Sequence, residues 1–290
     1  MACINPLTIY QKFSGKSITV PCNHCLNCLI RKQSQLEFLA KKELIDVYTS
    51  GRGASFVTLT YDNVHVPRTD DGFITLKKED LRNFFKSVRR QMEYHGDTTK
   101  FKYIACGEYG DNFSCRCHFH IVFLGLTDVQ ALKYTNKVWK NGNIDIGPLS
   151  AGGLSYVCKY LSKQHPDKDI KQLRTDLGCE NPFLVHSIGL GKKWIMENIY
   201  NILDNRFVFT INGKKYLYPK YVMEYVKART GSDYKKYVVD FISHSDDFNY
   251  AKSNNLDYID FSYEKSYLHY KHLITSLRSR NMAVDDITLS

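Results

Sequence analysis

The sequence contains no uninterrupted apolar run of about 18 residues, no signal peptide, and no internal repeat or low-complexity segment. A helix that crosses a bilayer needs about 20 mostly apolar residues, so we expect no membrane partner. Without a secretory signal the chain is expected in a reducing cytoplasm, where clustered thiols bind metal ions more often than they form disulfides. The nine cysteines therefore include candidate metal ligands.

A complete phosphate-binding loop is also missing. Ser14-Gly-Lys-Ser17 matches the end of that motif, but Tyr10 stands where its first glycine should be. No strand is expected in the position that the motif requires. We therefore expect no ATPase or helicase domain in this chain.

Acidic residues are in deficit, with 30 Asp and Glu against 40 Lys and Arg, which gives a net charge of +10. The basic residues are spread along the chain as pairs and do not form one tail. Such spacing fits a groove that follows the phosphates of a nucleic acid, although it is also compatible with surfaces that serve only solubility. At 290 residues the chain is long enough for one large domain or two.

A His-x-His pattern, His118-Phe-His120, lies in an apolar run that is typical of a strand. Side chains alternate along a strand, so both imidazoles face the same side, roughly 7 Å apart along the backbone. Glu108 follows the preceding apolar run, residues 101–106, and plausibly ends the neighbouring strand. Two imidazoles and one carboxylate predict a site for Mg²⁺ or Mn²⁺, which can act as a Lewis acid on a phosphate oxygen. A chance pair of polar strand residues is the alternative interpretation.

Two tyrosines follow at helical spacing. Tyr156 and Tyr160 are i, i+4 neighbours, and Lys159 and Lys163 form a second such pair beside them. A phenol with an ordinary pKa of about 10 needs a nearby cation to become a nucleophile at neutral pH, and the lysines can supply that charge. Taken alone, the segment is equally typical of an amphipathic helix with buried aromatic residues.

These motifs together resemble the HUH endonucleases, and among them the rolling-circle replication initiators of microviruses of the gokushovirus type. The order and spacing of the motifs agree over most of residues 1 to about 225. The resemblance rests on Phe56-Val-Thr-Leu-Thr-Tyr61, Cys106-Gly-Glu-Tyr-Gly110, His118-Phe-His120, Trp139-Lys-Asn-Gly142, Tyr156-Val-Cys-Lys-Tyr-Leu-Ser-Lys163, Ser187-Ile-Gly-Leu-Gly191 and Gly213-Lys-Lys-Tyr-Leu-Tyr-Pro-Lys-Tyr221.

The resemblance implies a metal-dependent tyrosine endonuclease and strand transferase acting on single-stranded DNA at a viral replication origin, with the two histidines on a central strand. Tyr156 would attack a phosphodiester and form a 5′-phosphotyrosine, and Tyr160 would cut the regenerated origin after one round, so that rolling-circle replication is initiated and terminated. The implied partners are a host helicase and the host replication machinery, in the cytoplasm of a bacterial cell. A relaxase or transposase of a mobile element, or a noncatalytic zinc-containing DNA-binding module, are the alternatives.

A cysteine cluster near the amino end forms a second candidate metal site. Cys22, Cys25 and Cys28 have the spacing of metal ligands, and Cys3 is the natural fourth ligand, with His24 a weaker choice. A tetrahedral zinc ion would fasten the start of the helix that follows. Independent thiols are the alternative, and an iron–sulfur cluster would need a close fourth cysteine that is absent.

The periodicity predicts an α+β fold with a central antiparallel sheet and flanking helices, covered on one face, with a helical extension at the carboxyl end. The expected divisions are a cysteine-cluster segment and helix at 1–50, a nuclease core at 51–165, and an extension at 166–290 that packs partly on the core. Residues 166–186 are expected to be a linker. The expected helices are 29–48, 77–92 capped by Thr75, 128–139, the tyrosine segment and 194–201; the expected strands are 55–61, 101–106, the histidine run, 144–146, and a hairpin of 206–211 and 214–217.

Overall fold

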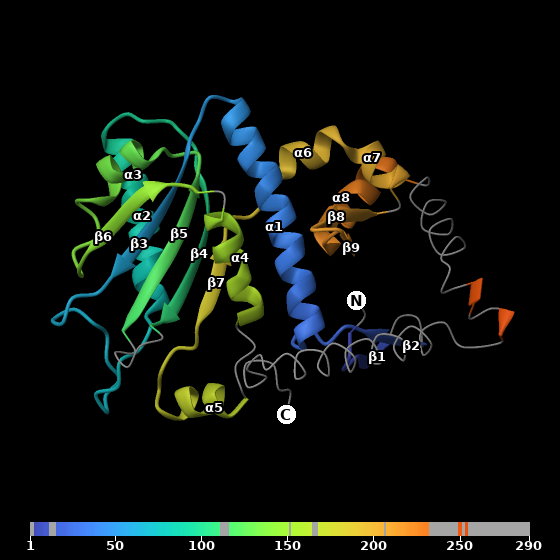
Figure 1. Cartoon of the computed structure of the whole chain (residues 1–290), viewed down its shortest axis with the longest axis horizontal. Coiled ribbons are helices and arrows are strands. Elements are labelled where there is room, and N and C mark those ends of the chain that lie inside the picture. Colours follow the sequence, from blue (N-terminus) through green and yellow to red (C-terminus); the bar gives the residue numbers. More distant parts are fainter. Residues whose placement is uncertain are drawn as a thin grey trace. The chain divides into compact units, whose positions relative to one another are not determined.

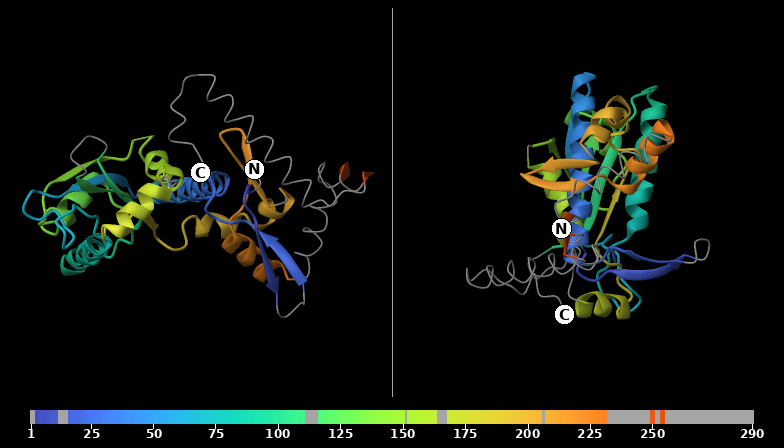
Figure 2. Two further views of the ribbon diagram at one scale, coloured as in Figure 1. Left: turned by 90° about the horizontal axis from the view of Figure 1, so that it is seen from below. Right: turned by 90° about the vertical axis from the view of Figure 1, so that its right-hand side faces the viewer.

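The computed structural model describes residues 3–11, 16–110, 116–150, 152–163, 168–205, 207–231, 249–250 and 253–254. Its contacts divide the chain into two compact units. One is Leu36–Trp194, and the other combines Met1–Gln35 with Ile195–Ser290. The helix α1 (Leu26–Thr49) is continuous (Figures 1 and 2) and contributes its first part to one unit and its second part to the other.

The unit Leu36–Trp194 is built on a five-stranded sheet in the order β6-β3-β5-β4-β7, in which every neighbouring pair is antiparallel. The predicted α+β fold with a central antiparallel sheet is confirmed. The strand that carries the two histidines is the middle one, as the resemblance implied. The strands are β3 (Ala54–Thr60), β4 (Lys102–Tyr109), β5 (Cys117–Leu124), β6 (Ile144–Pro148) and β7 (Phe183–His186).

Helices cover both faces of this sheet, so the expectation of cover on one face was wrong. The helix α2 (Lys78–Tyr94) and α3 (Asp128–Thr135) lie on one face, and α4 (Gly153–Lys163) lies on the other (Figure 1). The central strand shows the reason, because residues of both parities are buried: Phe119 and Phe123 on one face, Val122 and Leu124 on the other. A strand with two buried faces requires a layer of structure on each side.

The core beneath α2 is rich in aromatic side chains. All five apolar residues that the periodicity of α2 singles out are buried: Leu81, Phe84, Phe85, Val88 and Met92. The predicted cap is wrong. Lys77 precedes the helix without a side-chain cap, the backbone N–H of Lys78 donates to Glu180 (2.8 Å), and the Thr75 hydroxyl donates to the Leu76 carbonyl.

Residues 166–186 were expected to be a linker, and the structure corrects this. The described part of that segment forms α5 (Lys168–Asp176) and β7, which adds the fifth strand to the sheet. Strand β7 is only four residues long and pairs through backbone groups with β4. A strand this short leaves little periodicity in the sequence.

The second unit contains two small hairpins. The cysteine cluster lies between the hairpin of β1 (Leu7–Gln11) and β2 (Lys16–Val20) and the start of α1. The predicted turn at Asn212-Gly213 is confirmed, because both residues have positive φ, 49° and 72°, as a type I′ turn requires. The remaining elements are α6 (Lys192–Glu197), which spans the boundary of the units, α7 (Ile199–Asp204), β8 (Val208–Ile211), β9 (Lys214–Leu217) and α8 (Lys220–Thr230).

No helix in the part of the chain that the structure describes is long and apolar enough to cross a membrane.

Candidate active site

The sheet register brings the three predicted metal ligands together. Glu108 on β4 lies opposite His118 on β5, and Cys106 lies opposite His120. Opposite residues of an antiparallel pair project to the same face, and residues two apart on one strand share that face. Glu108, His118 and His120 therefore project from the face that α4 covers.

The three ligand atoms converge on one point. The Glu108 Oε1 lies 2.7 Å from the His118 Nε2 and 2.9 Å from the His120 Nε2, and all three groups lie within 4.8 Å of one another. Neighbouring ligands of an octahedral cation with bonds of about 2.1 Å are about 3 Å apart, so these separations match an edge of such a polyhedron. The three residues fit a divalent cation that takes nitrogen and oxygen ligands and leaves positions open.

The second ring nitrogen of each histidine has its own partner. The His120 Nδ1 lies 3.1 Å from the Thr58 hydroxyl, and the His118 Nδ1 lies 3.3 Å from the Arg116 carbonyl. Thr58 is opposite His120 in the β3–β5 register, which directs its side chain to the same face. Such partners fix ring orientation and tautomer, so both Nε2 atoms are held toward the centre of the site. The sequence analysis placed Thr58 in a motif without assigning it this contact.

The carboxyl of Glu108 remains ionised. Burial raises its pKa, but hydrogen bonds with His118, His120 and Tyr160 outweigh burial and hold the pKa well below its usual value. A carboxylate at the centre of the site is the form that a cation binds.

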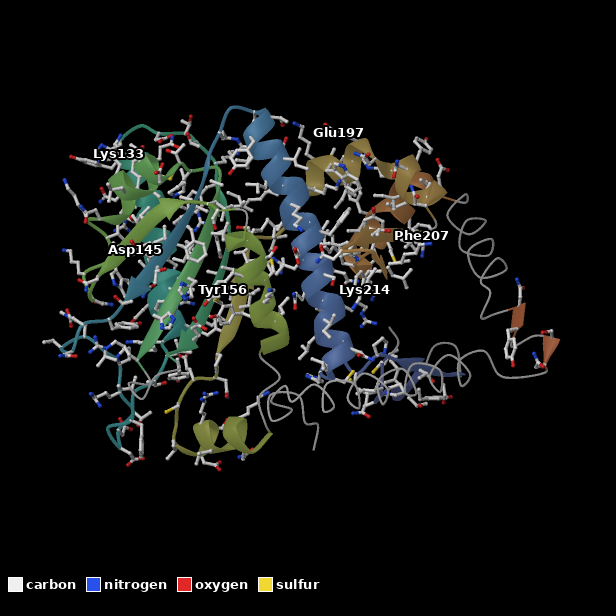
Figure 3. The ribbon with its side chains drawn as sticks, viewed as in Figure 1. Lys133, Asp145, Tyr156, Glu197, Phe207 and Lys214 are labelled. Carbon is white, nitrogen blue, oxygen red and sulfur yellow. The ribbon has the colours of Figure 1, made fainter. Side chains whose placement is uncertain are left out.

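The two predicted tyrosines lie next to this triad. The hydroxyl oxygens of Tyr156 and Tyr160 are 2.8 Å apart, and the ring of His120 is 5.5 Å from that of Tyr156 and 6.3 Å from that of Tyr160. Figure 3 shows Tyr156 on the side of α4 that faces the strands. The helical spacing predicted from the sequence is therefore the spacing that brings both phenols to the metal-ligand residues.

The tyrosines differ in exposure. Tyr156 is 39% exposed, whereas Tyr160 is 4% exposed. Burial, together with hydrogen bonds to Glu108 and Tyr156, raises the pKa of Tyr160 far above its usual value. Because the ionised carboxyl of Glu108 can only accept, Tyr160 donates its one proton there, and Tyr156 must then donate to the Tyr160 oxygen. The hydrogen bonds run in one direction, from the exposed phenol to the carboxylate.

The predicted lysines are placed less completely. Lys159 is exposed on α4, one residue before Tyr160. Lys163 ends that helix, and its side chain lies outside the described residues. The contribution of either lysine to the chemistry remains a prediction.

A buried carboxylate on α1 holds the tyrosine helix. The Ser155 hydroxyl donates to the Glu37 Oε1 (2.7 Å), and Lys41 pairs with the same oxygen (2.8 Å). Glu37 is 5% exposed, which is rare for a carboxylate unless it is paired. The sequence analysis missed Glu37, although an acidic residue inside the apolar stripe of α1 was a usable signal.

The four predicted thiols of the amino-terminal cluster also meet. Cys3, Cys22, Cys25 and Cys28 are buried, and all four sulfur atoms lie within 4.8 Å of one another. The Sγ of Cys3 lies 3.4 Å from that of Cys22 and 3.8 Å from that of Cys25. Thiolates bound to one tetrahedral zinc ion at about 2.3 Å are about 3.8 Å apart, so the thiols fit such an ion.

Backbone donors surround these sulfurs. The N–H groups of Cys25 (3.2 Å) and His24 (3.4 Å) donate to the Cys22 Sγ. Burial raises the pKa of Cys22, but these bonds outweigh it and lower the pKa to about 7. The exposed His24 is not part of the group, which agrees with its weaker standing as a ligand.

Comparisons with known proteins agree with this arrangement. Residues 54–165 match the family model of the replication-associated protein ORF2. The chain is 28% identical to the replication-associated protein ORF2 of Spiroplasma virus 4, over 76% of this chain and 79% of that protein. It is 26% identical to the replication-associated protein VP4 of Bdellovibrio phage phiMH2K (76% and 71%) and 25% identical to the replication-associated protein ORF4 of Chlamydia phage 1 (77% and 57%).

No solved structure matches the chain. The matched segment 54–165 begins at β3 and includes the whole triad and both tyrosines. With the site and these similarities together, the chain belongs to the ORF2 family of replication-associated proteins, in its microvirus type.

Proposed function

We propose that this protein is a metal-dependent tyrosine endonuclease that nicks single-stranded DNA at a viral replication origin and transfers the strand, which initiates and terminates rolling-circle replication. The observation that carries the proposal is the placement of two hydrogen-bonded phenols beside a convergent Glu108, His118 and His120 triad. The names of the relatives support a role in replication over one in plasmid mobilisation or transposition.

In the proposed reaction, Tyr156 is the first nucleophile because it is the exposed phenol. Its oxygen forms a bond to phosphorus while the bond from phosphorus to the 3′ oxygen breaks. The 3′ oxygen takes a proton, and the 5′-phosphate remains on Tyr156. A divalent cation held by Glu108, His118 and His120 would polarise the phosphate oxygens. Lys159 and Lys163 would stabilise the charge that develops around phosphorus.

Two tyrosines suit a strand transfer, because the phosphotyrosine preserves the energy of the broken phosphodiester. Tyr160 would attack the regenerated origin while Tyr156 still carries the strand. Strand separation would be left to a host helicase in the bacterial cytoplasm.

The test is a cleavage assay with the full-length protein, Mn²⁺ or Mg²⁺, and 3′-labelled single-stranded oligonucleotides that tile the encoding genome. Wild-type protein should give a covalent protein–DNA band with one origin segment. Tyr156→Phe, His118→Ala and His120→Ala should each lose it, while Tyr94→Phe, at an 82% exposed tyrosine on α2, should retain it. An undiminished band with Tyr156→Phe would refute the assignment. A noncatalytic DNA-binding module would give no band with any segment or metal.

A second part of the proposal is that Cys3, Cys22, Cys25 and Cys28 hold a structural Zn²⁺. The support is the closed set of four buried thiols and the absence of an open position for a substrate. Purified protein should contain one zinc ion per chain by elemental analysis, and Cys28→Ser should reduce this. Purified protein with four alkylatable thiols and no bound zinc or iron would instead show independent cysteines.

A further inference from the structure

A groove lies on the face of the sheet that is turned away from the tyrosine helix. Its volume is about 470 Å³. Tyr103 on β4 and Val185 on β7 contribute to it, and both have the parity of the face that α2 covers, opposite to Glu108. The lining residues from α2 are Lys78, Glu79, Leu81, Arg82, Phe85, Lys86 and Arg89. We call this site the α2 groove.

The floor of the α2 groove is flat and apolar. Phe85 and Tyr103 stack with ring centroids 3.8 Å apart and planes inclined by 20°. Leu81 and Val185 extend this surface. Aromatic and aliphatic groups of this kind offer a planar contact to a nucleobase, whatever its identity.

The rim of the groove is cationic. Four of its residues, Lys78, Arg82, Lys86 and Arg89, recur at helical spacing along one side of α2 and are exposed. The one acidic residue in the lining, Glu79, pairs with Arg82. Within the part of the chain that the structure describes, Lys86 and Arg89 form no ion pair.

Two of the cations lie against aromatic rings of the sheet. The Arg89 guanidinium is 5.0 Å from the ring centre of Phe101 and 5.9 Å from that of Tyr103, and the Lys78 amine is 5.5 Å from that of Phe183. Such contacts hold the charged groups next to the apolar floor. Charge and planar apolar surface are therefore available to one ligand at the same time.

We propose that the α2 groove binds single-stranded DNA at a second position, away from the nicked phosphodiester. A single strand alternates phosphates with planar bases, and the groove offers cations beside an aromatic floor in the same way. An acidic peptide matches the cations but not the floor. The inference rests on the proposed function, in which single-stranded DNA is the substrate.

The position of β7 makes both contacts possible for one strand. It is the edge strand next to β4, α4 packs against it on one face, and Val185 lines the groove on the other. A strand that leaves the tyrosine site can pass around this edge within a few nucleotides. The groove would hold the flank of the origin while the tyrosines act on the nick site.

The test measures binding of a fluorescent oligo-dT to full-length protein over a range of salt concentrations, in the Tyr156→Phe background so that no covalent product forms. Lys86→Ala/Arg89→Ala should weaken binding about tenfold and reduce the salt slope by about 1.4, from about 0.7 per lost phosphate contact. The matched control Arg90→Ala/Lys137→Ala removes two exposed cations outside the groove and should weaken binding less than threefold. The single variant Lys86→Glu, at an exposed helix position, guards against misfolding and should weaken binding in the same direction.

Photocrosslinking with iododeoxyuridine in the oligonucleotide should label the peptide that contains Tyr103 or Phe85. Equal loss in the groove and control variants, or crosslinks confined to the tyrosine face, would overturn the proposal. Displacement of oligo-dT from the groove by polyglutamate at equal charge concentration would also overturn it, because the floor would then contribute nothing. Failure of nicking with groove binding intact contradicts only the proposed function, whereas nicking of a short origin oligonucleotide without groove binding contradicts only this inference.

Discussion

The Thr58 hydroxyl lies 3.1 Å from the Nδ1 of His120, directly across the β3–β5 ladder. A hydroxyl can donate or accept, so it can pair with Nδ1 in either tautomer of the ring. When the Nε2 of His120 is a metal ligand, Nδ1 carries the proton and donates it in a hydrogen bond to the Thr58 oxygen.

Thr58→Val should therefore weaken Mn²⁺ binding by about 10-fold, in the range typical of lost partners of metal-binding histidines. The shape of the side chain is retained, so the unfolding temperature should change little. Titration calorimetry with Mn²⁺ measures the effect, and Thr58→Ser should restore most of the affinity. Equal affinity in the valine variant would show that the hydroxyl does not orient His120.

Tyr160→Phe should leave the first covalent adduct nearly intact and abolish the second transfer. Tyr160 is 4% exposed and its hydroxyl is bonded to Glu108, so it is not presented to an incoming phosphate. Single-turnover cleavage of a 3′-labelled origin strand measures the first step, and release of a circular product from a two-origin template measures the second. Loss of the first adduct in this variant, with Tyr156 unchanged, would reverse the assigned order.

Zinc affinity should fall as the pH is lowered. The folded pKa of Cys22 is about 7, below its ordinary value of 9.0. A group with a depressed folded pKa contributes stability above its unfolded pKa, and this contribution is lost as the pH falls through the folded pKa. Between about pH 9 and about pH 7 the metal-free fold should lose this part of its stability, and zinc binding should release more protons. Thermal unfolding with and without a chelator, at several pH values, measures both effects. A pH-independent difference between the two forms would contradict thiolate ligation.

Ser155→Ala should destabilise the protein by about 1–3 kcal/mol, because it leaves the buried Glu37 with Lys41 as its recorded partner. The loss should affect nicking more than metal binding, since the contact fixes α4 and not the sheet. Denaturant unfolding and Mn²⁺ titration separate the two. Lys41→Ala, which removes the more exposed partner of the same carboxylate, is the control and should cost less. A larger loss of metal affinity than of nicking would argue against this role.

Gly142→Ala should destabilise the protein by about 2–4 kcal/mol. The φ of Gly142 is 154°, and an added Cβ would lie 2.2 Å from the Thr60 carbonyl oxygen, which also accepts from the Trp139 indole (3.1 Å). Gly147→Ala in β6 meets nothing within 4 Å and serves as the control. Urea unfolding of both variants is sufficient, and similar stabilities would show that the turn adapts.

Periodicity and spacing predicted the elements that carry the site. His118 and His120 were placed on one face of a strand, and Tyr156 and Tyr160 on one face of a helix, because side-chain direction in regular elements depends on spacing alone. The contact between Glu108 and His118 depends on strand register, which the short segment between them made plausible.

What the sequence did not disclose depends on contacts between distant segments. Val185 and its strand pair with β4 through backbone groups, which leave no signature in side-chain type. The partnership of Glu37 with Ser155 joins residues 118 positions apart. The difference in exposure between Tyr156 and Tyr160 depends on how α4 is rotated against the sheet, and helical periodicity cannot specify that rotation.

The metal-ligand residues and the nucleophiles belong to different layers of the fold. Glu108, His118 and His120 project from two central strands that are hydrogen-bonded on both sides, whereas the tyrosines sit on an eleven-residue helix held in part by the Ser155–Glu37 bond. A small sliding or rotation of that helix would exchange one phenol for the other at a cation whose position does not change. The second cleavage of a replication round would then reuse the same electrostatic environment as the first, with only the attacking oxygen replaced.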